Sequence, residues 1–141
     1  MVNLLYILLL NLISLIYQDD CNIVGNWAYI EKDSTYHEFI ITDKYFWFIE
    51  DESVNVQMYS IDNNIIKRWY KTVPEEPMQS IEIIEIGESK MVIIYDKERY
   101  TLDRFEMELN FIALLTGDVE EIKKYLVGFY EREKNYYELA K

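Results

Sequence analysis

The sequence has few of the residues that build covalent or metal-bound frameworks. Cys21 is its single cysteine and His37 its single histidine among 141 residues. One cysteine excludes an intramolecular disulfide, and one imidazole beside Glu38, with no thiol nearby, provides no zinc-ligand set. No G-x-S-x-G, P-loop or dinucleotide-binding motif is present. We therefore expect no catalytic residues, no metal and no cofactor, and a fold that depends on its apolar core alone.

Basic residues are also scarce, since 14 Lys and Arg stand against 26 Asp and Glu and give a formal net charge of -12. Nucleic-acid binding draws most of its affinity from cations that neutralise phosphates, so this balance argues against a nucleic-acid partner. Attraction to an anionic membrane surface is disfavoured for the same reason. Two interpretations stay open: the acidity keeps the protein in solution, or it serves a cationic partner, such as a basic protein surface or a divalent cation.

Glycine and proline are few, with four and two residues, so Asn, Asp, Ser and Lys must supply most turns. Apolar residues make up 50% of the chain and aromatic residues 16%, including 13 Tyr. That content is enough to bury the core of one domain and argues against disorder. Tyrosine in such numbers suits half-exposed strands and binding faces, because its ring is apolar and its tip is polar.

The chain begins with an uncharged apolar stretch over residues 4–17. It is short for a membrane span and suits the central region of a signal peptide. We predict that residues 1–20 are a signal peptide or apolar leader. Residues 21–141 then form an exported domain, periplasmic or associated with the cell envelope, with no integral membrane span in the mature chain.

Two features of the leader leave alternatives open. No Lys or Arg precedes it, and no small-x-small cleavage site follows it, so a retained anchor or an N-terminal element of the fold stays possible. A cytoplasmic location follows if the leader is not a signal. Gln18, Asp19 and Asp20 precede Cys21 where a lipobox needs small residues, which disfavours lipidation.

Between residues 23 and 104 the chain forms eight short runs separated by polar turns, a pattern typical of an antiparallel meander. We expect strands at 23–31, 36–42, 45–49, 54–59, 65–72, 81–86, 91–95 and 99–103. The run 45–49 is apolar on both faces, so its outer face should be covered by the C-terminal region unless it is a central strand. The run 65–72 has mixed faces and suggests an edge or a partly solvated surface. Ile83 and Ile84 interrupt an alternating pattern and predict a bulge.

The pattern becomes helical after Arg104, and we expect a helical segment over 106–138. Its first helix covers 106–115, with Met107, Phe111 and Leu114 on one stripe. Asp118 is the expected N-cap of the second helix. That helix should have a favourable pair between Glu120 and Lys124 and a tail that frays from residue 131. Its expected apolar face consists of Val119, Ile122, Leu126 and Phe129.

The G-x-W formed by Gly25 and Trp27, the eight-strand meander and the helix after it together resemble the lipocalin family and its smaller bacterial lipocalin-like relatives. The match runs from Ile23 to the helical tail. The resemblance implies a mainly β fold, an up-and-down barrel or half-barrel followed by one or two C-terminal helices. It also implies that Trp27 closes the barrel floor, with Arg99 or Arg104 of the last strand packed over its ring. The strands are shorter than in full lipocalins, so we expect a small cup or none.

These features support two hypotheses for function. The first is an exported, non-enzymatic lipocalin-like domain that binds a small apolar ligand or a cell-envelope component. Its candidate ligand contacts are aromatic residues of the third to fifth strands, namely Tyr45, Trp47, Tyr59, Trp69 and Tyr70. The second is a small acidic protein of the immunity or inhibitor type that binds a basic protein partner, with an association that weakens in salt.

Overall fold

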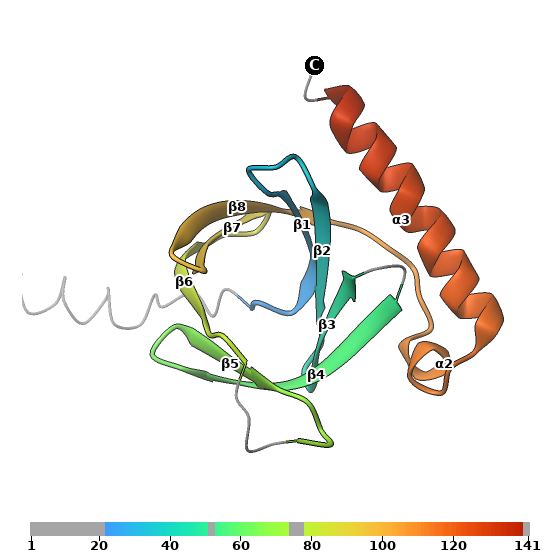
Figure 1. Cartoon of the computed structure of the whole chain (residues 1–141), viewed down its shortest axis with the longest axis horizontal. Coiled ribbons are helices and arrows are strands. Elements are labelled where there is room, and N and C mark those ends of the chain that lie inside the picture. Colours follow the sequence, from blue (N-terminus) through green and yellow to red (C-terminus); the bar gives the residue numbers. More distant parts are fainter. Residues whose placement is uncertain (1–21, 51–52, 74–77, 140–141) are drawn as a thin grey trace, which may run out of the picture.

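The eight predicted strands form one closed barrel in a computed structural model that describes residues 22–50, 53–73 and 78–139 (Figure 1). Every strand pairs antiparallel with its neighbours in the sequence, and the last strand returns to the first. The predicted mainly β fold and up-and-down meander are therefore confirmed. In chain order the strands are β1 (Gly25–Ile30), β2 (Tyr36–Ile41), β3 (Tyr45–Glu50), β4 (Ser53–Asp62), β5 (Ile65–Trp69), β6 (Ile81–Ile86), β7 (Lys90–Tyr95) and β8 (Glu98–Phe105).

Two tight turns confirm that polar residues replace glycine in the hairpins. Asn63 and Asn64 both have positive φ between β4 and β5, and Asp96 and Lys97 do so between β7 and β8. Positive φ at both central residues matches the right-handed twist of the flanking strands. The expected bulge is also present, because the register of β6 against β7 shifts between Ile83 and Glu85.

Of the two alternatives predicted for 65–72, the edge was wrong, whereas a partly solvated surface is present, since Lys67 is exposed and Ile65 and Trp69 are half-buried. The strand ends at Trp69, pairs on both sides, and buries Ile66 and Arg68 inside the barrel. A closed barrel has no edge strand, so an alternating pattern with a charged residue on each face does not mark one here.

Side chains of the barrel alternate between two separate cores. The inward-facing core holds Ile23, Trp27, Tyr29, Phe39, Ile41, Phe46, Ile66, Ile81, Ile83, Met91, Ile93 and Leu102. The outward-facing core lies between the sheet and the C-terminal helices and holds Ala28, Tyr36, Ile40, Trp47, Leu114, Tyr125 and Phe129. The expected covering of β3 is confirmed, since the rings of Trp47 and Phe111 lie 5.8 Å apart.

The predicted helix at 106–115 is shorter than expected. Only α2 (Phe111–Leu115) is helical, and the Asn110 side chain caps it by accepting a hydrogen bond from the Ala113 amide. Residues 106–110 have no regular secondary structure, and Met107 and Leu109 pack against the outward-facing core. Their spacing of two is a strand-like period, which suits a segment that crosses the barrel surface with one face covered.

The second helix, α3 (Val119–Leu139), begins as predicted. The Asp118 carboxylate accepts hydrogen bonds from the amides of Glu120 and Glu121, each at 3.0 Å. Other details differ from the prediction. Val119 is 61% exposed, the ion pair of Glu120 is with Lys123, and Tyr125 is the most buried side chain of the helix. No helix in the described ranges is long and apolar enough to cross a membrane.

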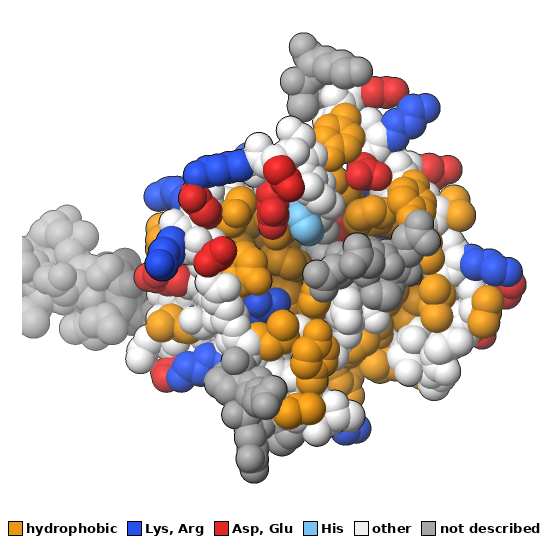
Figure 2. All heavy atoms as spheres, viewed as in Figure 1, with side chains coloured by type: hydrophobic (Ala, Val, Ile, Leu, Met, Phe, Trp, Pro, Cys, Tyr) orange, Lys and Arg blue, Asp and Glu red, His pale blue; other side chains and the backbone are white. Residues whose placement is uncertain are grey.

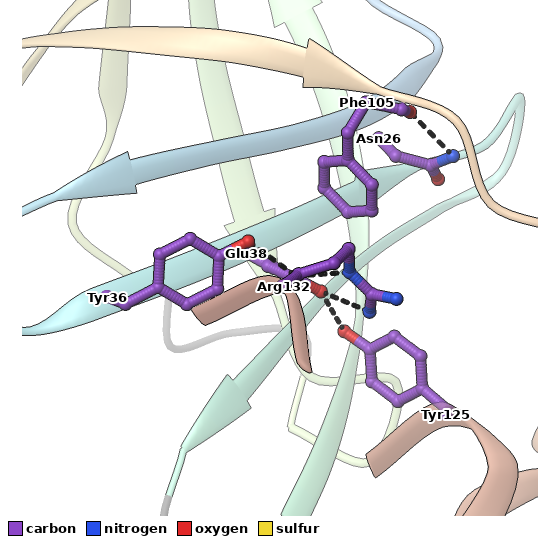
Figure 3. A network of polar contacts seen from close by, with 6 residues as sticks. All are labelled: Asn26, Tyr36, Glu38, Phe105, Tyr125 and Arg132. Carbon is purple, nitrogen blue, oxygen red and sulfur yellow. Dashed lines mark hydrogen bonds and ion pairs between the residues drawn. The ribbon is translucent and has the colours of Figure 1, made fainter. Parts of the chain in front are cut away.

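The tail of α3 does not fray at residue 131, because a buried polar cluster fastens it to β2 (Figure 3). We call Tyr36, Glu38, Tyr125 and Arg132 the helix clamp. Arg132 donates from Nε to Glu38 Oε1 at 2.7 Å and from Nη2 to Oε2 at 3.0 Å. The hydroxyls of Tyr36 and Tyr125 donate to the same carboxylate at 2.7 and 3.0 Å. Burial and the adjacent carboxylate raise the pKa of both tyrosines, so both stay protonated donors.

Candidate functional site

The two ends of the barrel differ in how they are closed. Because the strands form a meander, successive connections alternate between the ends. The chain enters β1 at the end that also holds the β2–β3, β4–β5 and β6–β7 turns, which we call the floor. The remaining connections lie at the opposite end, which we call the mouth.

Trp27 and Arg104 seal the floor. Trp27 is fully buried, and its indole N–H donates to the Ile23 carbonyl at 2.8 Å. The Arg104 guanidinium carbon lies 4.3 Å from the centroid of the Trp27 ring, and its two Nη atoms donate to the carbonyls of Val24 and Asn22, each at 3.1 Å. The cation and the ring thus tie the entry of β1 to the end of β8.

Gly25 is required at this seal by close approach. A Cβ added there meets Arg104 Nη1 at 2.7 Å, and the residue has a φ of +154°. A side chain at this position therefore displaces the guanidinium from the indole. Of the two arginines named from the sequence, Arg104 occupies this place, whereas Arg99 is exposed at the mouth end of β8.

The mouth contains a cavity of about 550 Å³. Figure 2 shows hydrophobic side chains gathered inside the ring of strands, with charged side chains around its margin. The barrel contributes Tyr29, His37, Phe39, Phe48, Arg68 and Tyr95 to its wall, and α3 contributes Leu126, Phe129, Tyr130 and Glu133. The helix clamp therefore also holds one wall of this cavity in place.

Aromatic rings fill one side of the mouth. Tyr29 stacks on His37 with ring centroids 5.1 Å apart and also contacts Phe39 and Tyr100. Burial, followed by the nearby Glu31 carboxylate, raises the pKa of Tyr29, so its hydroxyl is uncharged. His37 Nε2 lies 3.4 Å from Glu31 Oε1 but is buried without a hydrogen-bond partner.

Arg68 lies inside the mouth near the end of β5 and is only 3% exposed. Its Nη1 donates to Gln57 Oε1 at 3.4 Å and its Nη2 to the Gln79 carbonyl at 3.1 Å. The guanidinium carbon lies 5.0 Å from the ring centroid of Phe46 and 5.4 Å from that of Tyr95. Its Nε is buried and has no hydrogen-bond partner. The sequence analysis missed this residue.

No family model and no curated protein matches the chain. Among solved structures, it is similar to a lipocalin-like protein from Bacteroides uniformis, with a TM-score of 0.42 and 15% identity. The alignment covers 59% of this chain and 98% of that one. The lipocalin-like resemblance holds at the level of the fold, which rests on the closed eight-stranded meander and the helix after it.

The five aromatic residues predicted to contact a ligand do not line the mouth cavity. Tyr45 and Trp47 belong to the outward-facing core, and both border a separate apolar cleft of about 520 Å³ beside α2. Tyr59 packs against the inward-facing core and donates to the Thr42 carbonyl at 2.6 Å, which places its tip at the floor. Trp69 pairs with Met58, and Tyr70 follows β5 and is 37% exposed. The mouth cavity is thus lined by other residues of the same barrel, and the five predicted contacts stay a prediction.

The side chains of β1 and β2 alternate between the two faces of the sheet, and this alternation could have identified the residues that line the mouth. Tyr29 lies two residues after Trp27 and so shares its inward face, and Phe39 pairs directly with Trp27. Every second residue from Trp27 along β1, and from Phe39 along β2, therefore faces the barrel interior, which identifies the aromatic rings of the mouth. In the described part of the chain, no group of three His, Cys, Asp or Glu side chains could hold a metal ion.

Proposed function

We propose that this protein binds a small apolar ligand in the mouth of its barrel. The observation that supports the proposal is the mouth cavity of about 550 Å³, walled largely by aromatic and aliphatic side chains at one end of a barrel whose other end is sealed. Cavities that take small organic ligands commonly have volumes of roughly 300–1,000 Å³ and such a lining. Aromatic rings provide large apolar contact area with few rotatable bonds, which favours ligand burial.

The walls of this site are on rigid elements. Tyr29, His37, Phe39 and Phe48 lie on paired strands, and the α3 wall is held by the helix clamp. A site built on such elements needs little reordering when a ligand enters, so less binding energy is lost to ordering side chains. We infer a preformed binding site rather than one assembled by the ligand.

Replacing Tyr95 with alanine tests the site, with Tyr70→Ala as the matched control. Tyr95 lines the mouth, whereas Tyr70 lies after β5 and outside the cavity wall. Isothermal titration calorimetry with decan-1-ol should show binding by the wild type. Loss of the Tyr95 ring should weaken binding about tenfold, since tenfold corresponds to about 1.4 kcal/mol, less than a fully buried ring contributes. Tyr70→Ala should leave the affinity unchanged. Absence of binding by the wild type, or equal weakening in both variants, contradicts the proposal.

We also propose that the protein is exported. The support is the apolar leader over residues 4–17, which lies outside the described residues. Intact mass spectrometry of the protein from a native-like host should find a mature N-terminus between Gln18 and Asn22. A chain that keeps Met1, or one that carries lipid on Cys21, contradicts this expectation.

A further inference from the structure

The charge of Arg68 is unusual for its surroundings. Among the described residues that line the mouth cavity, it is the only lysine or arginine, and it is 97% buried. A buried charge is costly unless it is paired and hydrogen-bonded. A chain with a net charge of -12 has many carboxylates available to pair with such a cation.

The described contacts of Arg68 are nevertheless all with uncharged groups. Its hydrogen-bond acceptors are the side-chain oxygen of Gln57 and the main-chain oxygen of Gln79, and its other close contacts are the rings of Phe46 and Tyr95. No carboxylate in the described ranges lies within ion-pair distance of it. The buried Nε is a donor of a positive group that has no acceptor.

We propose, on the basis of the ligand-binding function above, that Arg68 binds the carboxylate of a monoanionic ligand whose apolar body lies among the aromatic rings of the mouth. A carboxylate suits this position because charge-assisted hydrogen bonds to guanidinium are short and roughly twice as strong as neutral ones. The ligand then provides the counter-charge that the described residues around Arg68 do not.

The residues at the margin of the mouth favour a ligand with one negative charge over a ligand with two. Glu31 and Glu133 border the same cavity, and each repels a second anionic group on the ligand. A phosphate dianion therefore meets one cation and two carboxylates, whereas a carboxylate held at Arg68 places only an apolar chain near the margin. The site thus selects for a fatty-acid-like or arylalkanoate-like monocarboxylate.

Two probes with the same chain length distinguish the contribution of the head group to the affinity from the contribution of the apolar chain. Decanoate and decan-1-ol are titrated into the full chain at pH 7.5, where the acid is ionised. The wild type should bind decanoate at least about tenfold more tightly, as expected for a desolvated charged hydrogen bond. Arg68→Leu should abolish this preference and keep the affinity for decan-1-ol. Arg99→Leu, which removes an exposed arginine at the same end of the barrel, should retain the preference.

The outcomes distinguish this inference from the proposed function. If the wild type binds neither probe, the binding function itself fails. If it binds both equally, or if Arg68→Leu keeps the preference for decanoate, only the role of Arg68 is overturned. Arg68→Gln is the second variant in case the leucine variant does not fold, and it carries the same expectation. The wild-type comparison needs no variant, so equal affinities there overturn the inference whatever the variants do.

Discussion

Trp27→Ala is expected to lower the free energy of unfolding by about 3–5 kcal/mol, a large share of the stability of a small domain. The indole is fully buried in the inward-facing core, its N–H is bonded to Ile23, and the Arg104 guanidinium lies over its ring. Alanine therefore leaves a cavity at the floor and also removes the surface that Arg104 covers. Urea denaturation of the purified variant, followed by far-ultraviolet circular dichroism, measures the loss.

Trp69→Ala is the matched control for this measurement. Trp69 is only partly buried and lies at the end of β5, in a strand whose buried inward-facing residues are Ile66 and Arg68. Its truncation should cost much less than that of Trp27, because part of the ring is already in water and the vacated space is open to solvent. Equal losses for the two variants, or a smaller loss at Trp27, contradict the assignment of Trp27 as the floor of the barrel.

Glu38→Ala should cost about 3 kcal/mol, the lower end of the range for breaking a buried ion pair. The substitution leaves Arg132 and the hydroxyls of Tyr36 and Tyr125 without their shared acceptor. The lower end applies because the Arg132 side chain is 24% exposed and water can solvate it in part. Glu38 joins β2 to α3, so the helix signal at 222 nm should be lost at a lower urea concentration than in the wild type.

Glu82→Ala provides the comparison for the helix clamp. Glu82 is also a strand glutamate, but it is exposed on β6. Its replacement should change the stability by no more than about 0.5 kcal/mol, as for most surface positions. A loss at Glu38 as small as the loss at Glu82 contradicts the view that the clamp fastens α3 to the barrel.

The strands were predictable because their signals are local. A period of two, polar turns, and the interruption at Ile83 and Ile84 each depend on residues next to one another in the chain. The N-cap at Asp118 belongs to the same class, because its carboxylate bonds to amides only two and three residues away. The predicted cover on β3 needed only the observation that both faces of the strand are apolar.

The helix clamp was not predictable, because its members are far apart in the sequence. Glu38 and Arg132 are separated by 94 residues, and nothing near either of them marks the other as a partner. The helix predicted at residue 106 failed for a different reason. Met107, Phe111 and Leu114 fit a helical stripe, but Met107, Leu109 and Phe111 also fit a strand-like period, and packing against the outward-facing core decided between them.

The predicted contacts and the lining of the mouth cavity are different residues because aromatic content does not distinguish the two faces of a strand. In most soluble barrels the outer face is polar, so aromatic residues point inward. Here α2 and α3 cover part of the outer face, and Tyr45 and Trp47 belong to that second core. Arg68 was overlooked because Lys67 and Lys71 lie on either side of it in the sequence, a pattern that predicted solvent exposure for the whole run 65–72.

The seam between β1 and β8 has a consequence for how fast the barrel forms. It pairs Asn26 with Phe105, which are 79 residues apart, so the barrel cannot close until nearly all of its strands are in place. Pairings between distant segments carry a large loop-closure entropy and make folding slow. During synthesis the chain therefore stays open until residue 105 has left the ribosome. For a protein that is exported as proposed, this delay keeps the chain unfolded while it is carried across the membrane.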